Sequence, residues 1–98
     1  MDEMAAEYMA LVEALLATAD RLSPLGAGIL AALHLDIAAD SRTFARLLGV
    51  AHALVLREVN IIGAAGGYIR ILKRDFRTQR TRYELSPAGK HLIDDVQG

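Results

Sequence analysis

The feature that most constrains the fold is a stretch over residues 66–85, where two short apolar segments flank a cationic loop. Residues 68–72 are β-branched, aromatic or aliphatic with one exception, and residues 82–85 alternate strictly between polar and apolar side chains. Both patterns are typical of β-strands. Residues 74–80 between them are too polar for a core and too long for a two-residue turn. The stretch therefore predicts a β-hairpin with a charged loop.

Positive charge is concentrated in and just after this hairpin. Residues 66–91 hold seven Lys or Arg and two Asp or Glu, a balance of +5, whereas the remainder holds four and ten, a balance of −6. The whole chain has a formal net charge of −1. A nearly neutral chain that gathers its cations in one place indicates a local contact with an anionic partner, rather than indiscriminate coating of nucleic acid.

Length and composition indicate one folded domain. A chain of 98 residues with 53% apolar residues can bury a modest core and is too apolar to be disordered. There is no cysteine, which excludes disulfides and thiolate chemistry. Acidic residues interrupt the N-terminal region, and no apolar run approaches the roughly 18–20 residues of a membrane span. We expect a cytoplasmic protein without a signal peptide or a membrane segment.

The regions around the hairpin show helical patterns. Residues 2–22 repeat apolar side chains every three or four positions, which predicts a long N-terminal helix. Ser23-Pro24 combines a capping residue with a residue suited to the first helical turn, so a second helix is expected to follow. Ser41 is the expected cap of a short helix that ends at Gly49. A longer helix is expected over residues 51–65.

The last helix is expected to start at Ser86-Pro87, which repeats the serine-proline signal. The predicted fold is α+β and mainly helical, with one domain over residues 1–98. Its parts are an N-terminal helix (2–22), a helical core (24–65), the hairpin (66–85) and a C-terminal helix (86–98). A short helix joined tightly to a longer one is the helix-turn-helix arrangement, and a hairpin directly after it is a wing.

In this order the chain resembles the winged helix-turn-helix domains of bacterial transcription regulators, closest to the multiple-antibiotic-resistance-regulator (MarR) type. The resemblance covers about residues 24–96. Asp75-Phe76-Arg77 matches the family's Asp-x-Arg wing signature, and residues 83–89 resemble its strand-to-helix transition with serine in place of threonine. The positions that fall at the family's helix-turn-helix spacing are Phe44, Ala45, Leu48, Gly49, Val50, Val55, Val59, Ile62 and Gly66.

The resemblance implies a homodimeric, DNA-binding transcription regulator. The helix beginning near Ala51 would enter the major groove, with the groove-facing positions His52, Ala53, Leu56, Arg57 and Asn60. This helix has few side chains that hydrogen-bond base edges, so we expect little base discrimination from it. Its apolar surface leaves open the alternative of a winged-helix module that binds a protein partner.

The cations of the hairpin are expected to contact DNA, and they are Arg74, Arg77 and Arg80 in the loop with Lys73 and Arg82 below it. Guanidinium groups suit this role because they bind phosphate in a bidentate manner. The alternative is a solvated loop in which Asp75 pairs with Arg77. Phe76 at the tip is expected to fold back onto the hairpin, with a wedge between bases as the alternative. Arg57 has the alternative of an ion pair with Glu58.

The N-terminal helix has a wider apolar stripe than one small domain needs. It predicts a dimer seam formed by Met4, Tyr8, Leu11, Leu15 and Leu22, with packing onto the chain's own core as the alternative. The three histidines lack the spacing of metal ligands, and no catalytic group of residues is visible. We therefore expect neither a metal, a cofactor nor enzymatic activity.

Overall fold

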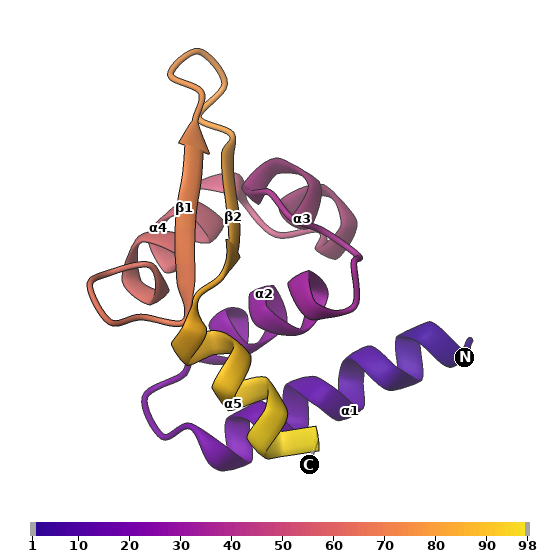
Figure 1. Ribbon diagram of the computed structural model, residues 1–98. Coiled ribbons are helices and arrows are strands. Elements are labelled where there is room, and N and C mark those ends of the chain that lie inside the picture. The colour runs from indigo at the N-terminus through magenta and orange to yellow at the C-terminus, as the bar shows by residue number, and fades with distance from the viewer. Residues whose placement is uncertain (1, 98) are drawn as a thin grey trace.

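The computed structural model describes residues 2–97, which form five helices and one two-stranded antiparallel sheet (Figure 1). The fold is α+β and mainly helical, as predicted. In Figure 1 the hairpin rises from α5 past α2, α3 and α4, and its loop extends beyond the helices. The elements in chain order are α1 (Glu3–Thr18), α2 (Pro24–His34), α3 (Ser41–Leu48), α4 (His52–Ile62), β1 (Ile69–Arg74), β2 (Thr81–Leu85) and α5 (Pro87–Gln97).

Short-range hydrogen bonds set several helix ends where the sequence predicts them. The Ser23 hydroxyl accepts a hydrogen bond from the Gly26 amide at 2.9 Å and caps α2. Gly49 follows α3 with a φ of +67°, the left-handed conformation expected there. The Ser86 hydroxyl caps α5 by accepting from the Gly89 amide at 3.0 Å. These caps fix where α2 and α5 begin and where α3 ends.

Two helices are shorter than predicted. The N-terminal helix ends at Thr18 and not at residue 22, because the chain becomes extended at Ala19 and turns so that Ala19 and Leu22 both reach the core. The helix expected over residues 51–65 runs from His52 to Ile62. Gly66, with a φ of +77°, then reverses the chain direction toward β1.

Asp40, and not Ser41, is the cap of α3. The Asp40 carboxylate accepts hydrogen bonds from the backbone amide and the hydroxyl of Thr43, each at 2.8 Å. Ser41 is the first residue of the helix and is completely buried. The prediction of Ser41 as the cap is therefore wrong by one residue, because two capping residue types stand side by side.

Helix α2 is the centre of the core. All residues from Gly26 to Ala32 are buried, because α1, α4 and β2 pack around them. The largest fully buried side chains elsewhere are Tyr83, Phe44, Leu15, Ile93, Val55 and Val59. One continuous apolar core therefore joins both ends of the chain to the base of the hairpin.

The hairpin contains an irregularity near its middle. Ile71 lies opposite Tyr83, but Lys73 lies opposite Arg82, so Leu72 is an extra residue that bulges from β1. Leu72 is 57% exposed. The bulge shifts the register between the buried base of the hairpin and its solvated upper part.

Residues 39–40 lie along the other edge of β2. The Tyr83 amide donates to the Ala39 carbonyl at 3.2 Å, and Asp40 forms an isolated bridge with Arg82. This contact holds the start of α3 against β2 and so fixes the hairpin relative to the helices.

The buried hydroxyl of Tyr83 has no hydrogen-bond partner among the described residues. Burial, with a smaller contribution from Asp40, raises the pKa of this hydroxyl, so it stays protonated. An unpaired buried polar group destabilises a fold. We expect Tyr83→Phe to raise the free energy of unfolding by about 1 kcal/mol, measured by urea denaturation.

Tyr8→Phe is the matched control for this measurement. The Tyr8 hydroxyl donates to the Gly28 carbonyl at 3.2 Å and joins α1 to α2. Its removal deletes this hydrogen bond between the two helices and should lower the free energy of unfolding by about 1 kcal/mol. Equal destabilisation by both substitutions would contradict the proposed difference between the two hydroxyls.

Candidate functional site

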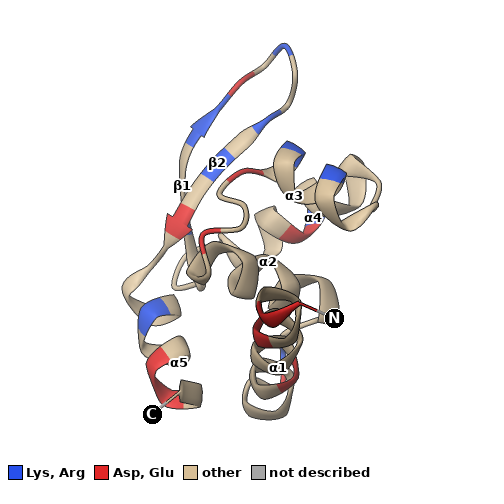
Figure 2. Ribbon diagram, turned by 90° about the vertical axis from the view of Figure 1, so that its right-hand side faces the viewer, with Lys and Arg blue, Asp and Glu red and all other residues tan. Residues whose placement is uncertain are grey.

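Opposite charges lie at opposite ends of the molecule. Residues 41–85 hold nine Lys or Arg and three Asp or Glu, a balance of +6, whereas the rest holds two and nine, a balance of −7. The cationic segment forms α3, α4 and the hairpin, and the acidic remainder includes α1, α2 and α5. Figure 2 shows this separation, with blue on the hairpin, α3 and α4 and red mainly on α1 and α5. The hairpin end is therefore the candidate site for an anionic partner.

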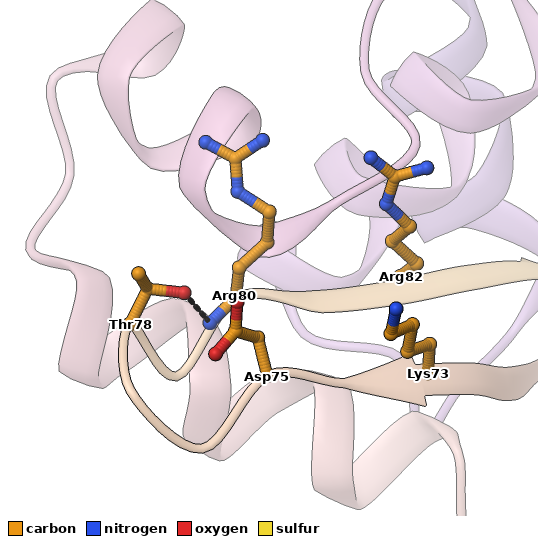
Figure 3. A pocket seen from close by; sticks show the side chains of 5 residues that line it. All are labelled: Lys73, Asp75, Thr78, Arg80 and Arg82. Carbon is orange, nitrogen blue, oxygen red and sulfur yellow. Dashed lines mark hydrogen bonds between the residues drawn. The ribbon is translucent and has the colours of Figure 1, made fainter.

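A hollow of about 400 Å³ lies against the upper hairpin. Figure 3 shows its lining residues, Lys73, Asp75, Thr78, Arg80 and Arg82, with the two guanidinium groups pointing to the same side. Lys73 and Arg82 are cross-strand neighbours. Three cations and one carboxylate line the hollow, so it favours an anion such as phosphate.

Asp75 organises the loop that connects the strands. Its carboxylate accepts from the Arg77 backbone amide at 2.9 Å, and its backbone pairs with Gln79 and Arg80 at 2.7 and 2.9 Å. Gln79 has a φ of +61°, which turns the chain back into β2. The prediction that Asp75 pairs with Arg77 is confirmed for the amide and not for the guanidinium. The Arg77 side chain has no carboxylate partner within residues 2–97 and is exposed to solvent.

Hydrogen bonds tie the hairpin to both helices beside it. Arg42 on α3 donates to the Thr78 carbonyl from Nε at 3.0 Å and from Nη2 at 2.6 Å. Arg74 donates from Nη2 to Asn60 Oδ1 on α4 at 3.0 Å. Two residues predicted to contact DNA, Arg74 and Asn60, thus bind each other. These bonds hold the cationic loop at a fixed angle to α3 and α4.

Asp40 supplies a further link to the hairpin. Burial acts to raise the pKa of its carboxyl, but hydrogen bonds from Thr43 and the charge of Arg80 outweigh burial, so the pKa lies below its ordinary value. The ionised carboxylate lies 3.8 Å from the Arg80 guanidinium. Arg80 therefore faces an intramolecular carboxylate as well as the hollow.

His52 is not groove-facing as predicted. Its Nε2 lies 2.8 Å from the hydroxyl of Ser41, and that hydroxyl also accepts from the Thr81 amide at 3.0 Å. Burial and then the charge of Arg42 lower the pKa of His52, which favours the neutral imidazole. The His52 ring is therefore turned toward Ser41, and the two hydrogen bonds of the Ser41 hydroxyl link α3, α4 and β2.

The remaining predicted positions on α4 differ in exposure. Ala53, Arg57 and Asn60 are exposed, and Leu56 is half-buried. The alternative ion pair of Arg57 with Glu58 does not form, because Glu58 is buried and accepts a hydrogen bond from the Ser23 hydroxyl. Within residues 2–97 the Arg57 side chain makes no hydrogen bond or ion pair, so it is available to a partner.

The predicted dimer seam is wrong at three of its five positions. Leu11, Leu15 and Leu22 are buried in the chain's own core, because α1 packs on α2 and α5. Tyr8 is half-buried against α2. Of the five, only Met4, which is 48% exposed, leaves about half of its surface open to solvent.

Neither a metal-binding cluster nor a membrane-spanning helix is found in the described part of the chain. Residues 2–97 contain no group of three or more His, Asp or Glu placed to hold a metal ion. No helix among them is long and apolar enough to cross a membrane. No protein-family model, curated protein or solved structure matches this chain. The cationic end formed by α3, α4 and the hairpin is thus the surface whose chemistry most directly indicates a ligand.

Proposed function

We propose that this protein is a winged helix-turn-helix DNA-binding protein of the MarR-like type that acts as a transcription regulator. In this proposal α3 and α4 form the helix-turn-helix and the β1–β2 hairpin is the wing. The element order supports the assignment. The observation that carries it is the +6 balance gathered on these elements in a chain whose net charge is −1.

Duplex DNA suits this surface because it is a regular array of phosphates. The side chains of Lys73, Arg77 and Arg82 are exposed and have no side-chain partner within residues 2–97. Each can neutralise a phosphate and release condensed counterions. Helix α4 lies beside the hairpin and exposes Ala53 and Arg57, and a helix of this kind fits the major groove.

The same geometry supports weak base discrimination. His52 turns inward to Ser41, and Asn60 uses its carbonyl oxygen to accept from Arg74. Arg57 then remains as the exposed α4 side chain suited to bidentate contact with guanine. Most of the affinity in this proposal comes from the sugar-phosphate backbone, and the sequence preference is small.

The proposal is tested by mapping amide chemical shifts while a short duplex DNA is added at low salt. We expect the perturbed amides to lie in α3, α4 and the hairpin, and the perturbations to disappear at high salt because the contacts are electrostatic. The acidic helices α1 and α5 provide the internal control. Perturbations centred on those helices, or none at low salt, would reject the proposal.

A second candidate function is protein binding by α4. Leu54 and Ile61 are 52% and 58% exposed, and with Leu25 they line a shallow hollow of about 240 Å³. Exposed apolar patches of this kind mark interaction surfaces. If duplex DNA leaves the α3, α4 and hairpin amides unperturbed at low salt, this candidate replaces DNA binding.

The homodimer also remains a proposal. The exposed apolar side chains that support it lie where α1 begins and α3 ends, since Met4, Leu47 and Leu48 border a hollow of about 270 Å³. A two-fold contact there would place two hairpins on one duplex. Sedimentation equilibrium of the samples used for the DNA titration reports the association state.

A further inference from the structure

Phe76 occupies the tip of the hairpin and is 84% exposed. The expectation that it folds back onto the hairpin is therefore wrong. Aromatic side chains usually bury most of their surface, and β1 and β2 offer apolar side chains on which the ring could have packed. An aromatic ring held away from all other apolar groups is available to a partner.

The loop that carries Phe76 is well organised. The Gln79 side-chain amide donates to the Phe76 carbonyl at 3.0 Å, and the Arg77 amide beside it donates to Asp75. Arg42 holds the Thr78 carbonyl from α3. The backbone on both sides of Phe76 is thereby fixed, and the loop that carries it extends beyond the helices (Figure 1).

Cations surround this apolar tip. Arg77 follows Phe76 directly. Arg74 and Arg80 stand at the two ends of the loop and keep exposed guanidinium surface beside their contacts with Asn60 and Asp40. A partner that matches both features presents anionic groups on either side of an apolar, stacked surface. Duplex DNA does so at every base step, where two phosphate strands flank the stacked bases.

We propose that Phe76 inserts between adjacent base pairs from the minor groove while the neighbouring cations hold the flanking phosphates. The inference rests on the proposed DNA-binding function. In this proposal α4 lies in the major groove, and the hairpin, whose loop extends beyond the helices (Figure 1), reaches the adjacent minor groove. Insertion unstacks the base step and kinks the duplex. Flexible pyrimidine–purine steps should be preferred, because they unstack most readily.

The test measures energy transfer between dyes at the two ends of a short duplex that contains central TA steps. The native protein should bring the ends closer, whereas Phe76→Ala should leave the duplex straight and bind about tenfold more weakly. Phe76→Leu retains an apolar wedge and should still bend the DNA. Leu72→Ala is the matched control, because Leu72 is an exposed apolar residue of the same hairpin away from the tip.

Each outcome is decisive. Bending by Phe76→Ala equal to that by the native protein overturns the wedge and leaves DNA binding intact. Absence of any salt-dependent binding to the duplex overturns the wedge together with the proposed function. Binding to anionic phospholipid vesicles that depends on Phe76, with no change in duplex bending, overturns the wedge in favour of a membrane contact. Loss of bending in Phe76→Ala, with bending kept in Phe76→Leu and Leu72→Ala, supports the insertion of Phe76 between base pairs.

Discussion

The triple substitution Lys73→Ala, Arg77→Ala and Arg82→Ala is expected to weaken binding to duplex DNA by about a hundredfold at moderate salt. Each of these side chains is exposed and lacks an intramolecular side-chain partner within residues 2–97. Each phosphate contact contributes about 0.9 to the slope of log affinity against log salt, so the slope should fall by nearly three. Fluorescence anisotropy across a salt series measures both quantities.

Two controls separate a local effect from a general loss of charge. Arg21→Ala with Lys90→Ala removes cations outside the hairpin, α3 and α4, and should change the affinity little. Arg70→Ala removes a hairpin cation that pairs with Glu84, at 2.8 Å from its Nε, and should also have a small effect. If the double variant weakens binding as much as the triple variant, the hairpin does not supply the main phosphate contacts.

Gly89→Ala is expected to lower the free energy of unfolding by about 3 kcal/mol and the Tm by roughly 15 °C. A Cβ atom at this position would lie 2.0 Å from the Tyr68 carbonyl oxygen. That oxygen cannot move easily, because it accepts a hydrogen bond from the Ser86 amide at 3.0 Å. Thermal unfolding followed by circular dichroism measures the effect.

Gly49→Ala is the matched control for this steric effect. Gly49 has a φ of +67°, but a Cβ atom there would meet nothing within 4 Å. Only the cost of the left-handed backbone remains, which is about 1 kcal/mol. If Gly89→Ala is no more destabilising than Gly49→Ala, the close approach of α5 to Tyr68 is not essential to the fold.

Sequence signals that act over a few residues predicted the fold well. Ser23-Pro24 and Ser86-Pro87 each start a helix, and the Gly49 and hairpin predictions are confirmed. In these cases the groups that satisfy the backbone lie within four residues of one another or on strands joined by one loop. Such signals can be read without knowing how the chain packs.

Predictions that depend on distant contacts failed. Ser41 and His52 are polar residues at plausible surface positions. In the fold, however, the Ser41 hydroxyl is buried, where it accepts a hydrogen bond from the amide of Thr81, forty residues further along the chain, and also contacts the His52 ring. Only the tertiary fold brings these residues together. The signal that could have helped is the choice between adjacent Asp40 and Ser41 as the cap, since capping by Asp40 releases Ser41 for this network.

The N-terminal helix shows a different limit. A wide apolar stripe indicates how much surface must be covered, but it does not identify what covers it. Leu11, Leu15 and Leu22 pack against the chain's own core because α2 is buried along most of its length and needs neighbours on several sides. Phe76 is the opposite case, since it is a single apolar side chain at the tip of the hairpin and stays 84% exposed.

The bulge at Leu72 also changes the exposed edge of the sheet. Residues 39–40 lie beside β2, whereas the outer edge of β1 has no strand partner within residues 2–97. An open edge can recruit a strand from another molecule, which leads to fibrous assemblies. The bulge interrupts the hydrogen-bonding pattern of that edge, and the charges of Lys73 and Arg74 are expected to disfavour pairing with a second copy. We therefore expect Lys73, which is proposed to hold phosphate, also to disfavour edge-to-edge association.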